Sequence, residues 1–216
     1  MNISEIINHY KAELGSNVTL VAISKTKPSS EILEAYKADQ KIFGENKIQE
    51  MAEKWEELPK DIEWHMVGHV QTNKVKYMAP FVSLVHAVDS LKLLKEIDKE
   101  AKKNKRTINC LLQIKIAEED SKFGISIEDA GKILASREFA ALDHVKVTGL
   151  MGMATFTNDM DQVKKEFQYL KENFDALKND YPNLEILSMG MSADYKIAVE
   201  SGSNMVRIGS AIFGER

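Results

Sequence analysis

The sequence predicts a single domain, residues 1–216, that folds as a (β/α)8 barrel, the TIM-barrel architecture. Short runs rich in β-branched and apolar residues alternate with longer amphipathic segments along the whole chain. About eight such runs occur, and the connections between them are short. Strict alternation of strands and helices predicts a parallel sheet with right-handed crossovers. A doubly wound open sheet is the alternative fold.

The first elements set this pattern. Residues 3–14 carry apolar side chains at the spacing of an amphipathic helix. Residues 19–25 are almost continuously apolar and β-branched, which is typical of a strand buried on both faces of a parallel sheet. After Pro28, a helix is expected to begin at about Glu31 with a serine as its cap.

The same two patterns repeat to the end of the chain. Further strands are expected at residues 41–44, 62–68, 81–89, 108–116, 145–154, 184–190 and 204–209. Helices are expected at residues 45–58, 69–79, 90–105, from Ser126 onward, at 160–179 and at 192–201. Ser126 is followed three residues later by Asp129, a variant of the capping box. Each expected strand therefore has a helix beside it in the sequence.

Composition limits the class of protein. The chain is 44% apolar and 29% charged, as in ordinary soluble globular proteins. A formal net charge of −4 argues against nucleic-acid binding. No stretch approaches the roughly 18 uncharged apolar residues of a membrane helix, and the N-terminus lacks the features of a secretory signal. A single cysteine favours a reducing compartment. We expect a cytoplasmic protein that binds neither nucleic acid nor membranes.

Lys25 is the first candidate functional residue. In a barrel, functional residues lie at the C-terminal ends of strands, and Lys25 ends the apolar run of residues 19–25. Burial lowers the pKa of a lysine amine and frees it as a nucleophile for Schiff-base chemistry. The alternative is a lysine that merely ends the strand and points to solvent.

Two loops suggest a phosphate site. Residues 188–192 and the pair Gly209 and Ser210 follow the expected seventh and eighth strands, whose loops often bind phosphate in this fold. Glycine lets the backbone approach an anion, and serine adds a hydroxyl donor. Tight turns between strand and helix also favour glycine and serine, so a purely structural interpretation stays open.

Arg207 and two histidines complete the candidates. Arg207 lies within an apolar strand, so it requires an acceptor, which is either a ligand or a structural ion-pair partner. His65 and His69 are four residues apart, but Met66 stands where a metalloprotease motif has glutamate. We expect no metal site there.

Seven motifs carry a resemblance to a known family. They are LVAISKTKP (20–28), IFGENKIQE (42–50), WHMVGHVQTNK (64–74), SKFGI (121–125), GLMGMA (149–154), LSMGMSADY (187–195) and VRIGSAIFG (206–214). In this order they resemble the pyridoxal-phosphate homeostasis protein family, whose members bind pyridoxal 5′-phosphate (PLP). The family fold is similar to the N-terminal barrel of alanine racemase, which agrees with the barrel predicted above.

The resemblance implies a role for each candidate residue. It implies that Lys25, and not Lys27, forms the internal aldimine with PLP. Arg207 would face the pyridine nitrogen, and Asn46 would line the pocket, with His65 as a neighbour. The residues implied to hold the phosphate are Ser188, Ser192, Gly209 and Ser210.

The resemblance also implies a carrier of PLP with no catalytic residues. A permanently charged arginine opposite the pyridine nitrogen disfavours its protonation and weakens carbanion stabilisation. Racemases of the alanine type add a tyrosine base from a C-terminal domain, and this sequence ends at Arg216, directly after the last expected strand. We expect a monomer or weak dimer that supplies PLP to PLP-dependent apo-enzymes. A PLP-dependent enzyme, such as a narrow-range amino-acid racemase, is the alternative, and a barrel that binds another phosphate is a weaker one.

Overall fold

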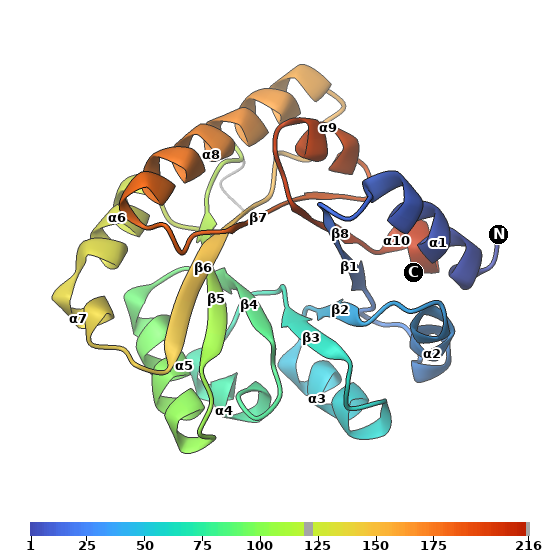
Figure 1. Ribbon diagram of the computed structural model, residues 1–216, viewed down its shortest axis with the longest axis horizontal. Coiled ribbons are helices and arrows are strands. Elements are labelled where there is room, and N and C mark those ends of the chain that lie inside the picture. The colour runs from blue at the N-terminus through green and yellow to red at the C-terminus, as the bar shows by residue number, and fades with distance from the viewer. Residues whose placement is uncertain (119–122, 215–216) are drawn as a thin grey trace.

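The strands of the computed structural model, which describes residues 1–118 and 123–214, close into an eight-stranded barrel in the order β1 to β8 (Figure 1). Neighbouring strands are parallel, and β8 pairs with β1 to close the barrel. The strands are β1 (Thr19–Ile23), β2 (Ile42–Glu45), β3 (Glu63–Met66), β4 (Leu84–Val88), β5 (Ile108–Ile114), β6 (Val145–Gly152), β7 (Ile186–Met191) and β8 (Met205–Ile208). The predicted barrel is confirmed, and the open sheet is excluded. The start of the SKFGI motif, residues 121 and 122, lies outside the described residues.

Helices surround the barrel (Figure 1). They are α1 (Ile3–Leu14), α2 (Ser29–Lys37), α3 (Ile48–Glu57), α4 (Val75–Met78), α5 (Leu91–Lys103), α6 (Ile127–Ala135), α7 (Arg137–Ala140), α8 (Met160–Asp180), α9 (Tyr195–Glu200) and α10 (Ser210–Phe213), and a 3-10 turn, η1 (Thr72–Lys74), precedes α4. The short helices α7 and α10 were not expected from the sequence. In the described part of the chain, no helix combines the length and apolar character that a membrane span requires.

The helix starts follow their capping groups. Ser126 caps α6 as predicted, since its Oγ accepts the Asp129 N–H at 3.0 Å. The serine cap expected for α2 is wrong, because the Pro28 carbonyl already accepts the Glu31 N–H at 3.1 Å and the helix begins at Ser29. The helix predicted from residue 192 begins at Tyr195, because the Asp194 side chain accepts the Met191 N–H at 2.6 Å and holds a turn there.

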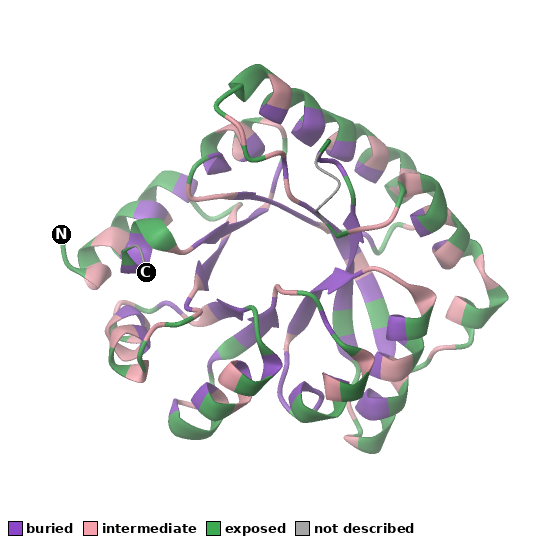
Figure 2. Cartoon of the chain, turned by 180° about the vertical axis from the view of Figure 1, so that it is seen from behind, coloured by how far each residue is buried: buried purple, intermediate pink, exposed green. Residues whose placement is uncertain are grey.

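The apolar core has two layers. A large cluster, which includes Phe43, Trp64 and Phe167, joins the barrel wall to the surrounding helices. A smaller cluster brings together side chains from β1, β4, β5, β6 and β8 and fills the barrel interior; its members are Val21, Leu84, Ala87, Leu111, Met151 and Met205. Figure 2 shows most of the barrel wall coloured as buried. The interior is packed at this level, so a ligand can enter only above it.

One glycine lets two strands approach closely. Gly149 on β6 pairs with Ile186 on β7, and a Cβ at position 149 would lie 1.8 Å from the Ile186 carbonyl oxygen. Any larger side chain would force these backbones apart. Gly149 therefore supports the position of β7, whose C-terminal end carries part of the candidate site.

Candidate functional site

Lys25 lies in a tight turn directly after β1, and not within the strand as predicted. The Ser24 carbonyl accepts the Lys27 N–H at 3.1 Å and closes the turn. Thr26, at the third position of the turn, has a φ of 65°, a conformation that usually requires glycine. The turn places Lys25 at the C-terminal end of the barrel, where function is expected in this fold.

Lys25 lines a cavity of about 290 Å³, here called the main cavity. The lining residues are Ile23, Lys25, Asn46, Val67, Gly68, His69, Gln113, Phe123, Met153, Met191 and Arg207. Three of the predicted site residues, Lys25, Asn46 and Arg207, therefore meet although they are far apart in the sequence. Apolar side chains form much of the wall, which suits a flat ring, while the polar groups are few.

A smaller pocket of about 90 Å³ adjoins the main cavity, since Ile23 and Lys25 line both. Its other lining residues are Thr26, Lys27, Gly209, Ser210 and Gly214. The Gly209 N–H donates to Ser192 Oγ at 3.3 Å, which joins the loops after β7 and β8. The predicted phosphate residues Ser192, Gly209 and Ser210 are thus brought together at the start of α10.

Arg207 is buried at the base of the main cavity. One terminal nitrogen, Nη1, donates to the Ser188 carbonyl at 2.9 Å and to Ser188 Oγ at 2.7 Å, while Nη2 donates to the Gly152 carbonyl at 3.0 Å. Burial lowers the pKa of Arg207 to about 10, so the guanidinium remains charged at neutral pH. These contacts hold a fixed positive charge at the edge of the cavity.

The structure does not bring Ser188 to the phosphate loops. Its side chain is fully buried inside the barrel and contacts Arg207 and His86, and it lines neither pocket. The structure therefore places Ser188 beside Arg207, away from the loop in which Ser192 accepts the Gly209 N–H. The physical reason is that Ser188 lies within β7 and faces the interior, four residues before the loop position that Ser192 occupies.

A chain of hydrogen bonds extends from Ser188 across the barrel interior. His86 on β4 contacts Ser188 Oγ through Nδ1 at 3.1 Å and His65 Nδ1 through Nε2 at 3.0 Å. Burial lowers the pKa of His65 to about 3, and the pKa of His86 also falls, first through burial and then through its electrostatic interactions with His65 and with the charged Arg207. Both rings are therefore neutral at pH 7.

His86 was missed by sequence reasoning. The sequence signal was the one that identified Arg207, a polar residue within an otherwise apolar strand. The structure also gives His65 and His69, four residues apart in the sequence, different neighbours. His65 faces His86 inside the barrel, whereas His69 lies 3.4 Å from Asp89 outside it.

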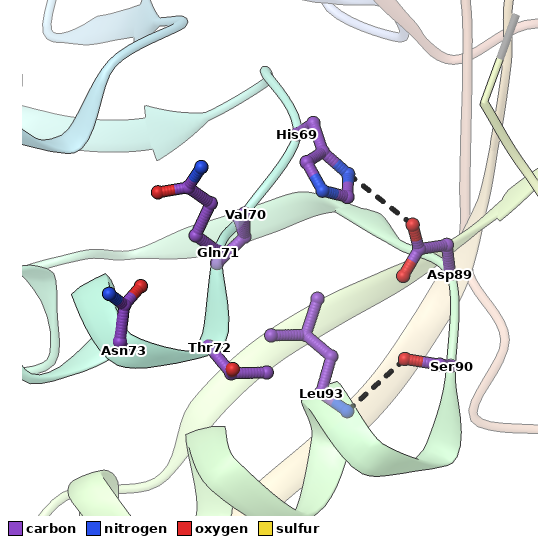
Figure 3. Close-up of a pocket in the computed structure, with 8 residues that line it drawn as sticks. All are labelled: His69, Val70, Gln71, Thr72, Asn73, Asp89, Ser90 and Leu93. Carbon is purple, nitrogen blue, oxygen red and sulfur yellow. Dashed lines mark hydrogen bonds and ion pairs between the residues drawn. The ribbon is translucent and has the colours of Figure 1, made fainter.

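A third, more open pocket of about 450 Å³ lies beside the main cavity and shares His69 with it (Figure 3). The other lining residues are Val70, Gln71, Thr72, Asn73, Asp89, Ser90 and Leu93. Figure 3 shows His69 pointing toward Asp89. The ring of Phe123 stacks on the His69 imidazole, with 4.7 Å between the ring centroids. His69 thus forms part of the wall between the two spaces.

Comparison with known proteins identifies the family. The family described as alanine racemase, N-terminal domain, matches residues 2–216. A pyridoxal phosphate homeostasis protein of Aquifex aeolicus is 39% identical over 210 residues, which cover 95% of this chain and 91% of the relative. This chain belongs to the pyridoxal phosphate homeostasis protein family. Another pyridoxal phosphate homeostasis protein, from Haemophilus influenzae, is 39% identical over 93% of this chain and 86% of its own length.

Solved structures agree with this family and its fold. PipY of Synechococcus elongatus PCC7942, solved without PLP, is 32% identical, has a TM-score of 0.92 and covers 99% of this chain and 100% of its own. The same protein solved with PLP bound has a TM-score of 0.90. The alanine racemase of Bacillus anthracis is 16% identical with a TM-score of 0.76, over 99% of this chain and 56% of its own, and shares the barrel fold.

Proposed function

We propose that this pyridoxal phosphate homeostasis family member binds PLP through Lys25 and buffers or supplies it without catalysing a reaction of its own. The observation that carries the proposal is the meeting of Lys25 and Arg207 in one cavity of about 290 Å³, beside a small pocket lined by Gly209 and Ser210. The names of the relatives and the PLP-bound structure of PipY support the choice of ligand.

The chemistry of the two pockets fits PLP. The aromatic ring suits the apolar walls of the main cavity. The phosphate suits the small pocket, where Gly209 and Ser210 of the lining, and Ser192 bonded to Gly209, would hold it through hydroxyl and backbone N–H groups. Lys27 also lines that pocket and adds positive charge. Asn46 would close the side of the main cavity.

Lys25 supplies the covalent step. Its amine condenses with the aldehyde of PLP, so that a C=N bond forms and water leaves. The turn after β1 places Lys25 at the border of the main cavity and the small pocket, because this residue lines both. The site thus favours a ligand whose phosphate occupies the small pocket while its ring aldehyde lies close to Lys25.

Arg207 favours holding over catalysis. We assign it to the pyridine nitrogen, where its charge disfavours protonation of that nitrogen and so weakens the electron sink that PLP enzymes use. Ser188 then supports Arg207 from below instead of binding phosphate. We further propose that the protein acts in the cytoplasm as a monomer or weak dimer, with PLP-dependent apo-enzymes as recipients.

The test combines loading, transfer and turnover. The purified protein is titrated with PLP while visible absorption is recorded, and the loaded protein is then mixed with an apo-enzyme in the presence of a scavenger of free PLP. We expect a visible band on loading, recovery of apo-enzyme activity, and no turnover of a panel of amino acids above that of free PLP. Turnover at ordinary enzyme rates would instead make the protein a PLP-dependent enzyme, and failure to load would remove the proposal.

A further inference from the structure

The turn that carries Lys25 has an unfavourable backbone conformation. Thr26 has a φ of 65°, in the left-handed region, where a β-branched side chain is sterically disfavoured. Such conformations persist only where the surroundings fix them. Contacts to the turn from outside should therefore hold it in place.

Three side chains from β2 and α3 make those contacts. Lys54 Nζ donates to the Ser24 carbonyl at 2.8 Å, and Glu50 Oε1 accepts the Thr26 N–H at 2.5 Å. The Ser24 hydroxyl donates to Glu45 Oε1 at 2.6 Å. The backbone is thus held by a side chain on each side of Lys25, at Ser24 by Lys54 and at Thr26 by Glu50.

Lys54 joins these contacts into one unit. Its Nζ lies 2.8 Å from Glu45 Oε1 and 2.8 Å from Glu50 Oε1, in addition to its bond to Ser24. We call Lys54, Glu45 and Glu50 the clamp. The Lys54 side chain is 8% exposed and that of Glu45 is 0% exposed, so the clamp is built largely away from water.

Net stability does not explain a buried clamp of this kind. Removing charges from water costs about as much as their attraction returns, so apolar residues of similar size would stabilise the fold equally well or better. One oxygen of the clamp, Glu45 Oε2, is buried with no hydrogen-bond partner among the described residues, which adds to this cost. What the clamp does provide is a fixed conformation at residues 24 and 26.

We propose that Lys54 is a positioning residue for Lys25, and that the clamp of Lys54, Glu45 and Glu50 holds the turn so that the Lys25 amine stays at the border of the two pockets. The clamp touches the residues on either side of Lys25 through their backbone, so it acts through Lys25. Its effect should be larger on covalent capture of an aldehyde than on affinity for the ring and phosphate, although Thr26 and Lys27 of the same turn also line the small pocket. This inference rests on the proposed covalent role of Lys25.

The test compares two ligands on the full-length protein. PLP reports covalent capture through visible absorption and borohydride trapping, whereas 4′-deoxypyridoxine 5′-phosphate has the same ring and phosphate but no aldehyde. Glu50→Ala cuts the tie to Thr26 at a partly exposed site, and Lys54→Met removes the centre of the clamp. Glu53→Ala is the matched control, because Glu53 is exposed on the same helix, α3.

We expect both clamp variants to capture PLP about tenfold more slowly than wild type, since each loses a charge-assisted hydrogen bond at the turn. Affinity for the deoxy analogue should stay within about twofold, and Glu53→Ala should match wild type for both ligands. If Lys54→Met fails to fold, the capture rate and analogue affinity of Glu50→Ala alone test the inference. Capture at the wild-type rate in Glu50→Ala would overturn the inference, as would an equal loss of analogue affinity. Absence of trapping in wild type would instead remove the proposed function.

Discussion

Ser188 and Ser201 offer a matched pair of buried hydroxyls with opposite surroundings. Ser188 Oγ lies 2.7 Å from Arg207 Nη1 and 3.1 Å from His86 Nδ1. Ser201 Oγ is buried without a hydrogen-bond partner among residues 1–118 and 123–214. Replacing each serine by alanine removes the same atoms, so the difference between the variants isolates the hydrogen bonds.

The structure sets the size of the effect. In Ser188→Ala, Arg207 keeps its bond to the Ser188 carbonyl at 2.9 Å, so the loss on that side is partial. The His86 nitrogen loses its partner in a buried site, which costs about 1–3 kcal/mol. We expect Ser188→Ala to lower the free energy of unfolding by about 2–3 kcal/mol, or roughly 4–12 °C in Tm for a chain of this length. Ser201→Ala should lose nothing, or gain up to about 1 kcal/mol.

The assay is urea unfolding of the PLP-free protein at pH 7, followed by circular dichroism. PLP is removed because a ligand bound to the folded state would add to its stability. If Ser188→Ala lowers the free energy of unfolding no more than Ser201→Ala does, the hydrogen bonds of the Ser188 hydroxyl do not stabilise the fold and the reasoning is refuted. That result would also remove the reason for assigning Ser188 to the support of Arg207.

Three further predictions concern pH, packing and the phosphate. In the unfolded chain His65 takes up a proton below about pH 6.5, whereas in the folded chain it does so only near its pKa of about 3. The free energy of unfolding therefore decreases as the pH is lowered from about 6.5 to about 3. In urea titrations, His65→Gln should reduce that slope by about 1.4 kcal/mol per pH unit. Gly149→Ala should cost about 3 kcal/mol through its clash with Ile186, whereas Gly131→Ala in α6 should gain up to about 1 kcal/mol, both by urea unfolding. Ser192→Ala should raise the Kd for PLP about tenfold but leave that for pyridoxal, which has no phosphate, unchanged by fluorescence titration.

Each of these has a contradicting result. An unchanged pH slope in His65→Gln would mean that the imidazole is not held neutral in the folded barrel. Equal effects of the two glycine variants would mean that β6 and β7 can separate at no cost. A parallel loss of PLP and pyridoxal affinity in Ser192→Ala would place the phosphate elsewhere.

The fold was predictable because its signals are local. Buried parallel strands are apolar on both faces, so a run such as residues 108–116 identifies itself without knowledge of its partners. The end of β1 was misplaced by two residues for a different reason. The turn at Thr26 depends on Glu50, which is 24 residues away in the sequence, and a strand pattern carries no trace of that contact.

The site was only partly predictable. The sequence singled out Lys25, Arg207 and Gly209, which line the two adjoining pockets, because a charged or flexible residue near a strand end is locally unusual. The position of Ser188 beside Arg207 could not be predicted, because the pairing of β7 with β8 shifts between Ser188 and Met191 and a single sequence does not reveal that shift. His86 was missed because its partner Ser188 lies across the barrel, 102 residues away in the sequence.

Covalent trapping of PLP tests the central claim most directly. The purified protein is loaded with PLP, reduced with borohydride to fix any C=N bond, digested and examined by mass spectrometry, together with Lys25→Ala and with Lys27→Ala as the neighbouring control. We predict that the loaded protein is yellow before reduction and that the label is then found on the peptide that contains Lys25. The label should be lost in Lys25→Ala and retained in Lys27→Ala. A label on another lysine, or a protein that cannot be loaded, would contradict the account.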